Sequence, residues 1–221
     1  MRGLSLALAI LLVPMGASAE PVAYFERSVG AAFLPNVNTQ TYTFVLPPDT
    51  ISGHAELNYG TQLVAGAEIG YGGFAHGDLR WSIISYDYLH ATLDSARLVG
   101  TINGVPSSIT LSNGVLNGAG FDFDNSVHLL TTDVYYNFPD IGGVVRPYLG
   151  VGAGAAFIEH ADAELALAAT AGLRYGFAHN RAYIGVRYRY YRIAGPTDDL
   201  GIKYDPIQAH TVSAVIGFYL D

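Results

Sequence analysis

The feature that most constrains the fold of this chain is a period-two alternation of apolar with small or polar residues. In the segment 146–158, for example, Leu149, Val151 and Phe157 lie on one face, and glycines occupy alternate positions on the other. Such alternation is typical of a β-strand with one face in an apolar environment. After the first twenty residues, no apolar run reaches the roughly 18 residues that a transmembrane helix needs. An apolar chain of this kind can cross a membrane only as a closed β-barrel.

The composition agrees with a membrane environment. Of the 221 residues, 50% are hydrophobic and only 14% are charged, whereas about a quarter are charged in soluble domains. The alternative is a soluble two-sheet β protein, whose strands also alternate, but the low charge makes it less favourable. The net charge of −8 argues against nucleic acid as a partner, because nucleic-acid binding needs basic patches. The absence of cysteine excludes a disulfide framework and a lipoprotein anchor.

The first residues have the pattern of a targeting segment. Arg2 precedes an uninterrupted apolar stretch at 4–13, and small residues at 17–19 provide a cleavage site. The apolar stretch is too short to span a bilayer. We therefore expect residues 1–19 to be a cleavable signal peptide and residues 20–221 to be an outer-membrane β-barrel domain.

Eight segments carry the alternating pattern, which is strongest in the last four. In chain order they are 23–33, 62–71, 78–89, 130–138, 146–158, 164–177, 181–193 and 208–220. In the third segment the pattern fails near Ser85, which predicts either a β-bulge or a strand that continues above the membrane. No helical pattern occurs between the segments.

The connections between these segments alternate in length. Three are short and rich in turn residues (72–78, 138–146 and 177–181), and four are exposed and mostly long (35–58, 90–125, 159–163 and 194–207). Short periplasmic turns and long extracellular loops are typical of outer-membrane barrels. The sequence therefore predicts an all-β fold, an eight-stranded antiparallel up-and-down transmembrane β-barrel with both termini in the periplasm.

Three stretches of the chain have a familiar order and spacing. They are 28–35 (SVGAAFLP), 134–138 (VYYNF) followed by 146–154 (RPYLGVGAG), and 186–190 (VRYRY) leading to His210 and 216–219 (IGFY). Together they resemble the OmpA-like and opacity-protein superfamily of eight-stranded outer-membrane barrels. The resemblance implies a surface-exposed barrel in the bacterial outer membrane, often an antigen or adhesion factor, and implies no single chemistry.

The resemblance also implies partners. They are the outer-membrane lipid and lipopolysaccharide, the barrel-assembly machinery, and a host or surface ligand that binds the loops. Members of the superfamily usually end on an aromatic residue that the assembly machinery recognises. This chain instead continues to Leu220 and Asp221, so Phe218 or Tyr219 is the expected assembly signal.

Acidic residues and arginines occur in equal number on the predicted inward face of the strands. They are Glu26, Glu68, Asp133 and Glu164, and Arg80, Arg174, Arg187 and Arg189. Buried charges persist only when they are paired, and arginine pairs well with carboxylates. Because the interior of an eight-stranded barrel is just wide enough for side chains, we expect an ion-pair network that plugs the lumen. The alternative is a narrow, arginine-lined channel for small solutes.

The seven histidines raise a third hypothesis, a lipid A-modifying enzyme, which would need a histidine beside a serine and a carboxylate. Only His210 comes close to a serine in the strand period, at Ser213. No two histidines fall at metal-ligand spacing. We therefore expect no catalytic site, no metal and no cofactor. The favoured interpretation is a barrel that displays surface loops for adhesion or host contact, or that supports the envelope.

Overall fold

The computed structural model describes residues 22–46, 48–72, 79–118, 124–142, 144–177, 181–198 and 201–220. The expected signal peptide lies outside these ranges, as do His76 and His179. Among the residues described, no helix has the length and apolar character needed to cross a membrane.

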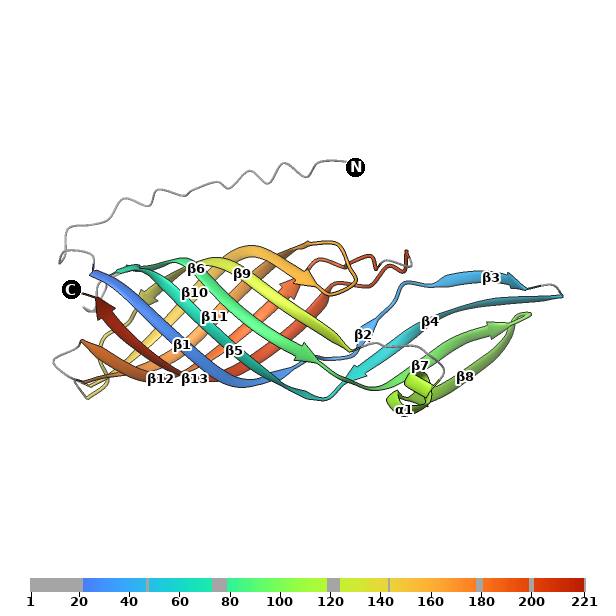
Figure 1. Ribbon diagram of the computed structural model, residues 1–221, viewed down its shortest axis with the longest axis horizontal. Coiled ribbons are helices and arrows are strands. Elements are labelled where there is room, and N and C mark those ends of the chain that lie inside the picture. The colour runs from blue at the N-terminus through green and yellow to red at the C-terminus, as the bar shows by residue number, and fades with distance from the viewer. Residues whose placement is uncertain are drawn as a thin grey trace.

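Eight long strands close into an antiparallel barrel (Figure 1). They are β1 (Val22–Phe33), β5 (Thr61–Gly72), β6 (Leu79–Ala91), β9 (Asn125–Asn137), β10 (Val145–Ile158), β11 (Glu164–Phe177), β12 (Ala182–Ile193) and β13 (Ile207–Leu220). Each pairs with the next barrel strand along the chain, and β13 pairs with β1 to close the ring. The predicted up-and-down barrel is confirmed. The largest boundary difference is at β9, which begins at Asn125 rather than at 130.

The outer surface of the barrel is apolar, because every second side chain of these strands points outward. Leu149, Val151 and Phe157 of β10 are among the exposed residues, as the alternation predicts. Exposed aromatic residues gather near the short turns (Tyr71, Trp81, Tyr136, Tyr175, Phe177 and Phe218) and near the opposite rim (Phe33 and Phe157). Aromatic girdles at both ends of an apolar band are typical of transmembrane barrels. The exterior therefore matches a lipid bilayer.

The failed alternation in β6 is a β-bulge. The pairing of β6 with both neighbouring strands shifts between Ser82 and Ser85. Ile83 and Ile84 both face outward, 45% and 47% exposed. One additional residue in a strand reverses the orientation of all side chains that follow it. The bulge therefore turns Ser85 and Asp87 into the lumen.

The two longest connections form a five-stranded antiparallel sheet that extends beyond the barrel (Figure 1). The first contributes β2 (Val37–Asn38), β3 (Tyr42–Leu46) and β4 (Asp49–Tyr59); the second contributes β7 (Leu93–Ile102), β8 (Val105–Ser112) and the short helix α1 (Asn113–Gly118). β4 pairs with β7, and β7 pairs with β8. The expectation of connections without helical structure is thus wrong at α1. Strands rich in serine and threonine, such as β8, resemble loops in sequence because one of their faces is polar.

This sheet lies at the end of the barrel opposite the beginning of β1 and the end of β13 (Figure 1). Since long connections are extracellular in outer-membrane barrels, we call it the extracellular sheet. The turn between β7 and β8 consists of Asn103 and Gly104, with φ of 54° and 79°. Positive φ at both central residues is the geometry of a two-residue hairpin turn. The Asn103 side chain also accepts a hydrogen bond from the Thr50 amide and donates one to Asp49 (2.9 and 2.6 Å), which ties the β3–β4 hairpin to the β7–β8 hairpin.

Candidate functional site

A cluster of acidic residues and arginines fills the half of the lumen nearer the short turns. It consists of Glu26 (β1), Glu68 (β5), Arg80 and Asp87 (β6), Asp133 (β9), Arg174 (β11), and Arg187 and Arg189 (β12). None of these residues is more than 3% exposed. Four carboxylates face four guanidinium groups, so the formal charges cancel. We call this cluster the lumen network.

Glu68 is the most connected carboxylate of the lumen network. Its Oε1 lies 2.6 Å from Nη2 of Arg80, and its Oε2 lies 3.2 Å from Nη1 of Arg187. Tyr24 and Tyr135 each donate a hydroxyl hydrogen bond to Glu68, at 2.6 and 2.8 Å. These contacts come from β1, β6, β9 and β12, so Glu68 connects most of the barrel wall.

Glu26 is the direct register partner of Glu68 and contacts the same nitrogen of Arg80. Its carboxylate lies 3.0 Å from Arg80 and 2.9 Å from Arg187, and it accepts a hydrogen bond of 2.6 Å from Tyr183. Nε of Arg174 lies 3.7 Å away. The Arg174 guanidinium also stacks on the ring of Tyr148, 3.6 Å from its centroid. Tyrosine rings and hydroxyls thus occupy the spaces that the ion pairs leave.

Arg189 connects the remaining acidic residues. It lies 2.8 Å from Asp87 and 3.0 Å from Asp133. Tyr191 donates a hydrogen bond to the same Asp87 carboxylate. Glycines opposite these groups make room for them: a Cβ at Gly152 would overlap the Asp133 carboxylate. The glycine-rich face of β10 therefore serves close packing, as the sequence predicts.

The structure changes one member of the predicted set. Glu164 is not part of the lumen network: it is the first residue of β11 and pairs with Ala156. Ten residues along the strand separate it from Arg174, a distance of about 30 Å. Asp87 takes its place. Continued strict alternation from Leu79 would place Asp87 outside, and only the bulge at Ile83 and Ile84 turns it inward. The failed pattern in β6 was the signal that could have located it.

The one histidine–serine pair that the sequence offers, His210 and Ser213, does not form the constellation that a hydrolase needs. His210 faces outward and hydrogen-bonds to the Tyr188 hydroxyl at 2.7 Å, whereas Ser213 faces the lumen. His128 forms the same kind of bond with Tyr86, also at 2.7 Å. Because His210 and Ser213 lie on opposite faces of β13, they cannot act as a nucleophile–base pair. Within the described part of the chain, no group of three or more metal-ligating side chains comes together.

The two expected assembly-signal residues occupy opposite faces at the end of β13. Phe218 is exposed on the lipid-facing side, in register with Phe25 of β1. Tyr219 faces inward, and its ring lies against Tyr24 and Tyr183, with centroids 6.3 and 5.7 Å apart. Of the two, only Phe218 presents its ring on the outside of the barrel.

The extracellular sheet is amphipathic. Its register places Ala55, Leu98 and Ile109 side by side on one face, and Glu56, Arg97 and Thr110 on the other. Glu56 and Arg97 form an ion pair of 3.3 Å on the polar face. On the apolar face, Leu98 and Ile109 are 43% and 54% exposed. An apolar face this exposed outside a membrane is typical of a contact surface.

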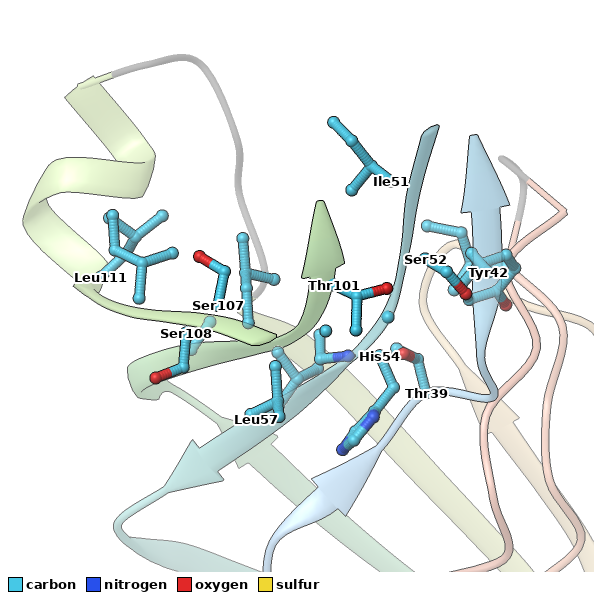
Figure 2. A pocket seen from close by; sticks show the side chains of 18 of the residues that line it. Thr39, Tyr42, Ile51, Ser52, His54, Leu57, Thr101, Ser107, Ser108 and Leu111 are labelled. Carbon is cyan, nitrogen blue, oxygen red and sulfur yellow. Dashed lines mark hydrogen bonds between the residues drawn. The ribbon is translucent and has the colours of Figure 1, made fainter. Parts of the chain in front are cut away.

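A groove with a volume of about 490 Å³ is associated with this sheet. Its lining includes Ile51 and Leu57 of β4, Leu98 of β7 and Leu111 of β8. Figure 2 shows the groove between α1 on one side and Tyr42 of β3 on the other. We call it the sheet groove.

Paired charges inside and apolar side chains outside invert the arrangement of a soluble protein. Lipid requires such an exterior, and a closed barrel satisfies every backbone group of its wall without an edge strand. The protein is an outer-membrane β-barrel. Its location is therefore the bacterial outer membrane.

No family model matches the chain, and neither does any curated protein. Among solved structures, Neisserial surface protein A (NspA) is 14% identical over 91% of this chain and 100% of its own, with a TM-score of 0.47. The outer membrane protease OmpT of Escherichia coli is 7% identical over 90% of this chain and 97% of its own, with a TM-score of 0.42. The attachment invasion locus protein Ail of Yersinia pestis is 16% identical over 89% of this chain and 99% of its own, with a TM-score of 0.28. Identities this low carry no information on activity.

Proposed function

We propose that this barrel displays the extracellular sheet for contact with another molecule, as an antigen, an adhesion factor or a structural component of the envelope. The observation that carries the proposal is that the two longest connections build one ordered sheet. The Asn103 contacts tie its two hairpins together, and its apolar face is exposed. A built, amphipathic surface outside the membrane supports a contact role better than a transport role.

Surface display is testable because the chain has no cysteine. Ser107 on β8 is exposed, and Ile141 lies in the short connection between β9 and β10. In intact cells, we expect a membrane-impermeant maleimide to label Ser107→Cys and not Ile141→Cys. Both variants should react once the outer membrane is permeabilised. Labelling of Ile141→Cys in intact cells would reverse the proposed orientation.

The contact role is tested by cell adhesion. Cells that carry the protein should adhere to a surface more strongly than cells that lack it. Leu98→Lys with Ile109→Lys should abolish this difference, because it places two charges on the apolar face. Labelling at position 107 in the same background verifies that the sheet is still displayed. Equal adhesion of all three strains would favour an envelope-structural role.

The principal alternative is a narrow channel, and the lumen network opposes it. Its charges are balanced and its side chains are buried, so no continuous aqueous path is expected through this half of the barrel. In planar bilayers we expect no steady single-channel current from the purified protein. Steady currents that change with Arg187→Gln would establish conduction and contradict a closed lumen.

A lipid A-modifying enzyme is the second alternative. The opposite orientations of His210 and Ser213 remove the one candidate pair that the sequence offers. We expect the lipid A mass spectrum to be the same in strains with and without the protein. A reproducible loss or gain of an acyl chain would establish the enzyme instead.

A further inference from the structure

The lumen changes character above the network. Beyond Asp87 and Arg189, most inward-facing residues are apolar or small, and Gln62 of β5 is a buried polar exception. The apolar and small residues are Val64, Leu89, Ala91, Val127, Leu129, Ala156, Ala166, Ala168, Ile193 and Ala209. The change is abrupt, because Leu129 is the direct register partner of Asp87. The interior of a transmembrane barrel is generally polar. The apolar interior at the extracellular end is therefore not suited to a water-filled path.

This apolar end contains a cavity of about 300 Å³, which we call the mouth cavity. Leu89, Val127, Leu129 and Ala209 belong to its wall. The volume is at the lower end of the range for small-molecule sites, about 300–1,000 Å³. It is therefore suited to one alkyl chain rather than to a lipid with several. The barrel wall is closed, so the extracellular side is the route of entry.

The polar lining of the mouth cavity includes two carboxylates, two tyrosines and His160, whose Nε2 lies 3.8 Å from Oε1 of Glu159. Glu159 and Asp198 contribute carboxylates, and among the described lining residues there is no lysine or arginine. Tyr59 and Tyr204 also line the cavity. Burial raises the pKa of the Tyr59 hydroxyl to about 12. It also raises the pKa of the Tyr204 hydroxyl well above its usual value. Both phenols thus stay neutral, and the only formal negative charges of the lining are the two carboxylates.

The mouth cavity is continuous with the apolar face of the extracellular sheet. Leu57 belongs to the same buried apolar cluster as Leu89 and Leu129, and the partly buried Tyr204 packs against this cluster. Tyr204 also lines both the mouth cavity and the sheet groove. An alkyl chain that contacts the sheet groove can therefore reach the barrel interior along apolar side chains. The lumen network forms the floor that stops it.

We propose that the mouth cavity binds a single-chain amphiphile, with its alkyl tail inside the barrel and a cationic headgroup at the Glu159 and Asp198 carboxylates. The apolar wall favours a hydrocarbon tail. The acidic rim favours a positive headgroup over a negative one. This binding goes beyond the proposed surface contact and does not depend on it.

The test uses the whole protein in lipid nanodiscs, titrated calorimetrically with dodecyltrimethylammonium, with empty nanodiscs as the blank. We expect a saturable heat in addition to partitioning into the lipid. Ala209→Phe should abolish it, because the ring occupies the cavity. The matched control is Ala214→Phe on the same strand, which faces lipid and should retain the saturable heat. Heat-modifiable gel migration verifies that both variants are folded.

The preference for a cationic headgroup is tested separately, without a substitution that fills the cavity. Dodecyl sulfate, with the same tail and the opposite charge, should give a weaker saturable heat than dodecyltrimethylammonium. Glu159→Gln should reduce this preference, and since Glu159 is exposed the variant should fold normally. The proposal is overturned if the protein adds no saturable heat to that of empty nanodiscs, or if Ala214→Phe loses as much as Ala209→Phe. Equal binding of the two amphiphiles would overturn the proposed preference for a cationic headgroup.

Discussion

Glu68→Gln is expected to destabilise the barrel by about 3–5 kcal/mol, the usual cost of removing one partner from a buried ion-pair cluster. The substitution keeps the size of the side chain but leaves Arg80 and Arg187 without one of their counter-charges. The buried cluster would then carry a net positive charge in a medium that solvates it poorly. Urea unfolding in lipid vesicles measures the loss. Trp81, the one tryptophan of the chain, supplies the fluorescence signal from the lipid-facing side of β6.

The matched control for this prediction is Glu164→Gln, which removes the same charge outside the lumen network. We expect the free energy of unfolding of this variant to remain close to that of the unmodified protein. A second check restores the charge balance: Arg80→Met added to Glu68→Gln should recover part of the lost stability. Equal stability of Glu68→Gln and Glu164→Gln would contradict the central role of Glu68.

Gly172→Val is expected to prevent most of the protein from reaching the folded barrel. A Cβ at this position would overlap the ring of Tyr148. A shift of that ring would disrupt its stacking with the Arg174 guanidinium and its packing against Tyr135, whose centroid lies 5.7 Å away. Overpacking a tight interior costs about 1–3 kcal/mol even where the neighbours can adjust. The measurement is the heat-modifiable folded fraction after refolding into detergent or lipid.

Ala169→Val is the control for this second prediction. Ala169 lies on the same strand but is exposed on the lipid-facing side, so added volume there does not enter the packed lumen. It should fold as efficiently as the unmodified chain. If Gly172→Val folds equally well, the Tyr148 ring does not occupy the position described above.

The agreement between sequence and structure is uneven along the barrel wall. In β10 to β13, small or polar inward residues alternate with apolar outward ones, so the pattern identifies both the strand and its orientation. In β6 the same reasoning places Asp87 on the wrong face. A bulge is defined by how β6 pairs with β5 and β9, and in the sequence it is visible only as a break in the alternation. The assignment of Glu164 fails for a related reason. Alternation determines which face a residue occupies but not how far along the barrel it lies.

The sequence by itself determined the membrane environment, the eight strands and seven of the eight charged residues of the lumen network, because these depend on a local period of two and on composition. Only the tertiary structure decided which charges meet, since that depends on strand register across the barrel. It also decided that two connections, 35–58 and 90–125, pair with each other as a sheet. The same holds for the apolar mouth cavity, whose wall combines residues from β6, β9, β12 and β13. Contacts between residues distant in sequence arise from strand pairing and barrel closure. The alternation of residues along the chain specifies neither the register of the strands nor the closure of the barrel.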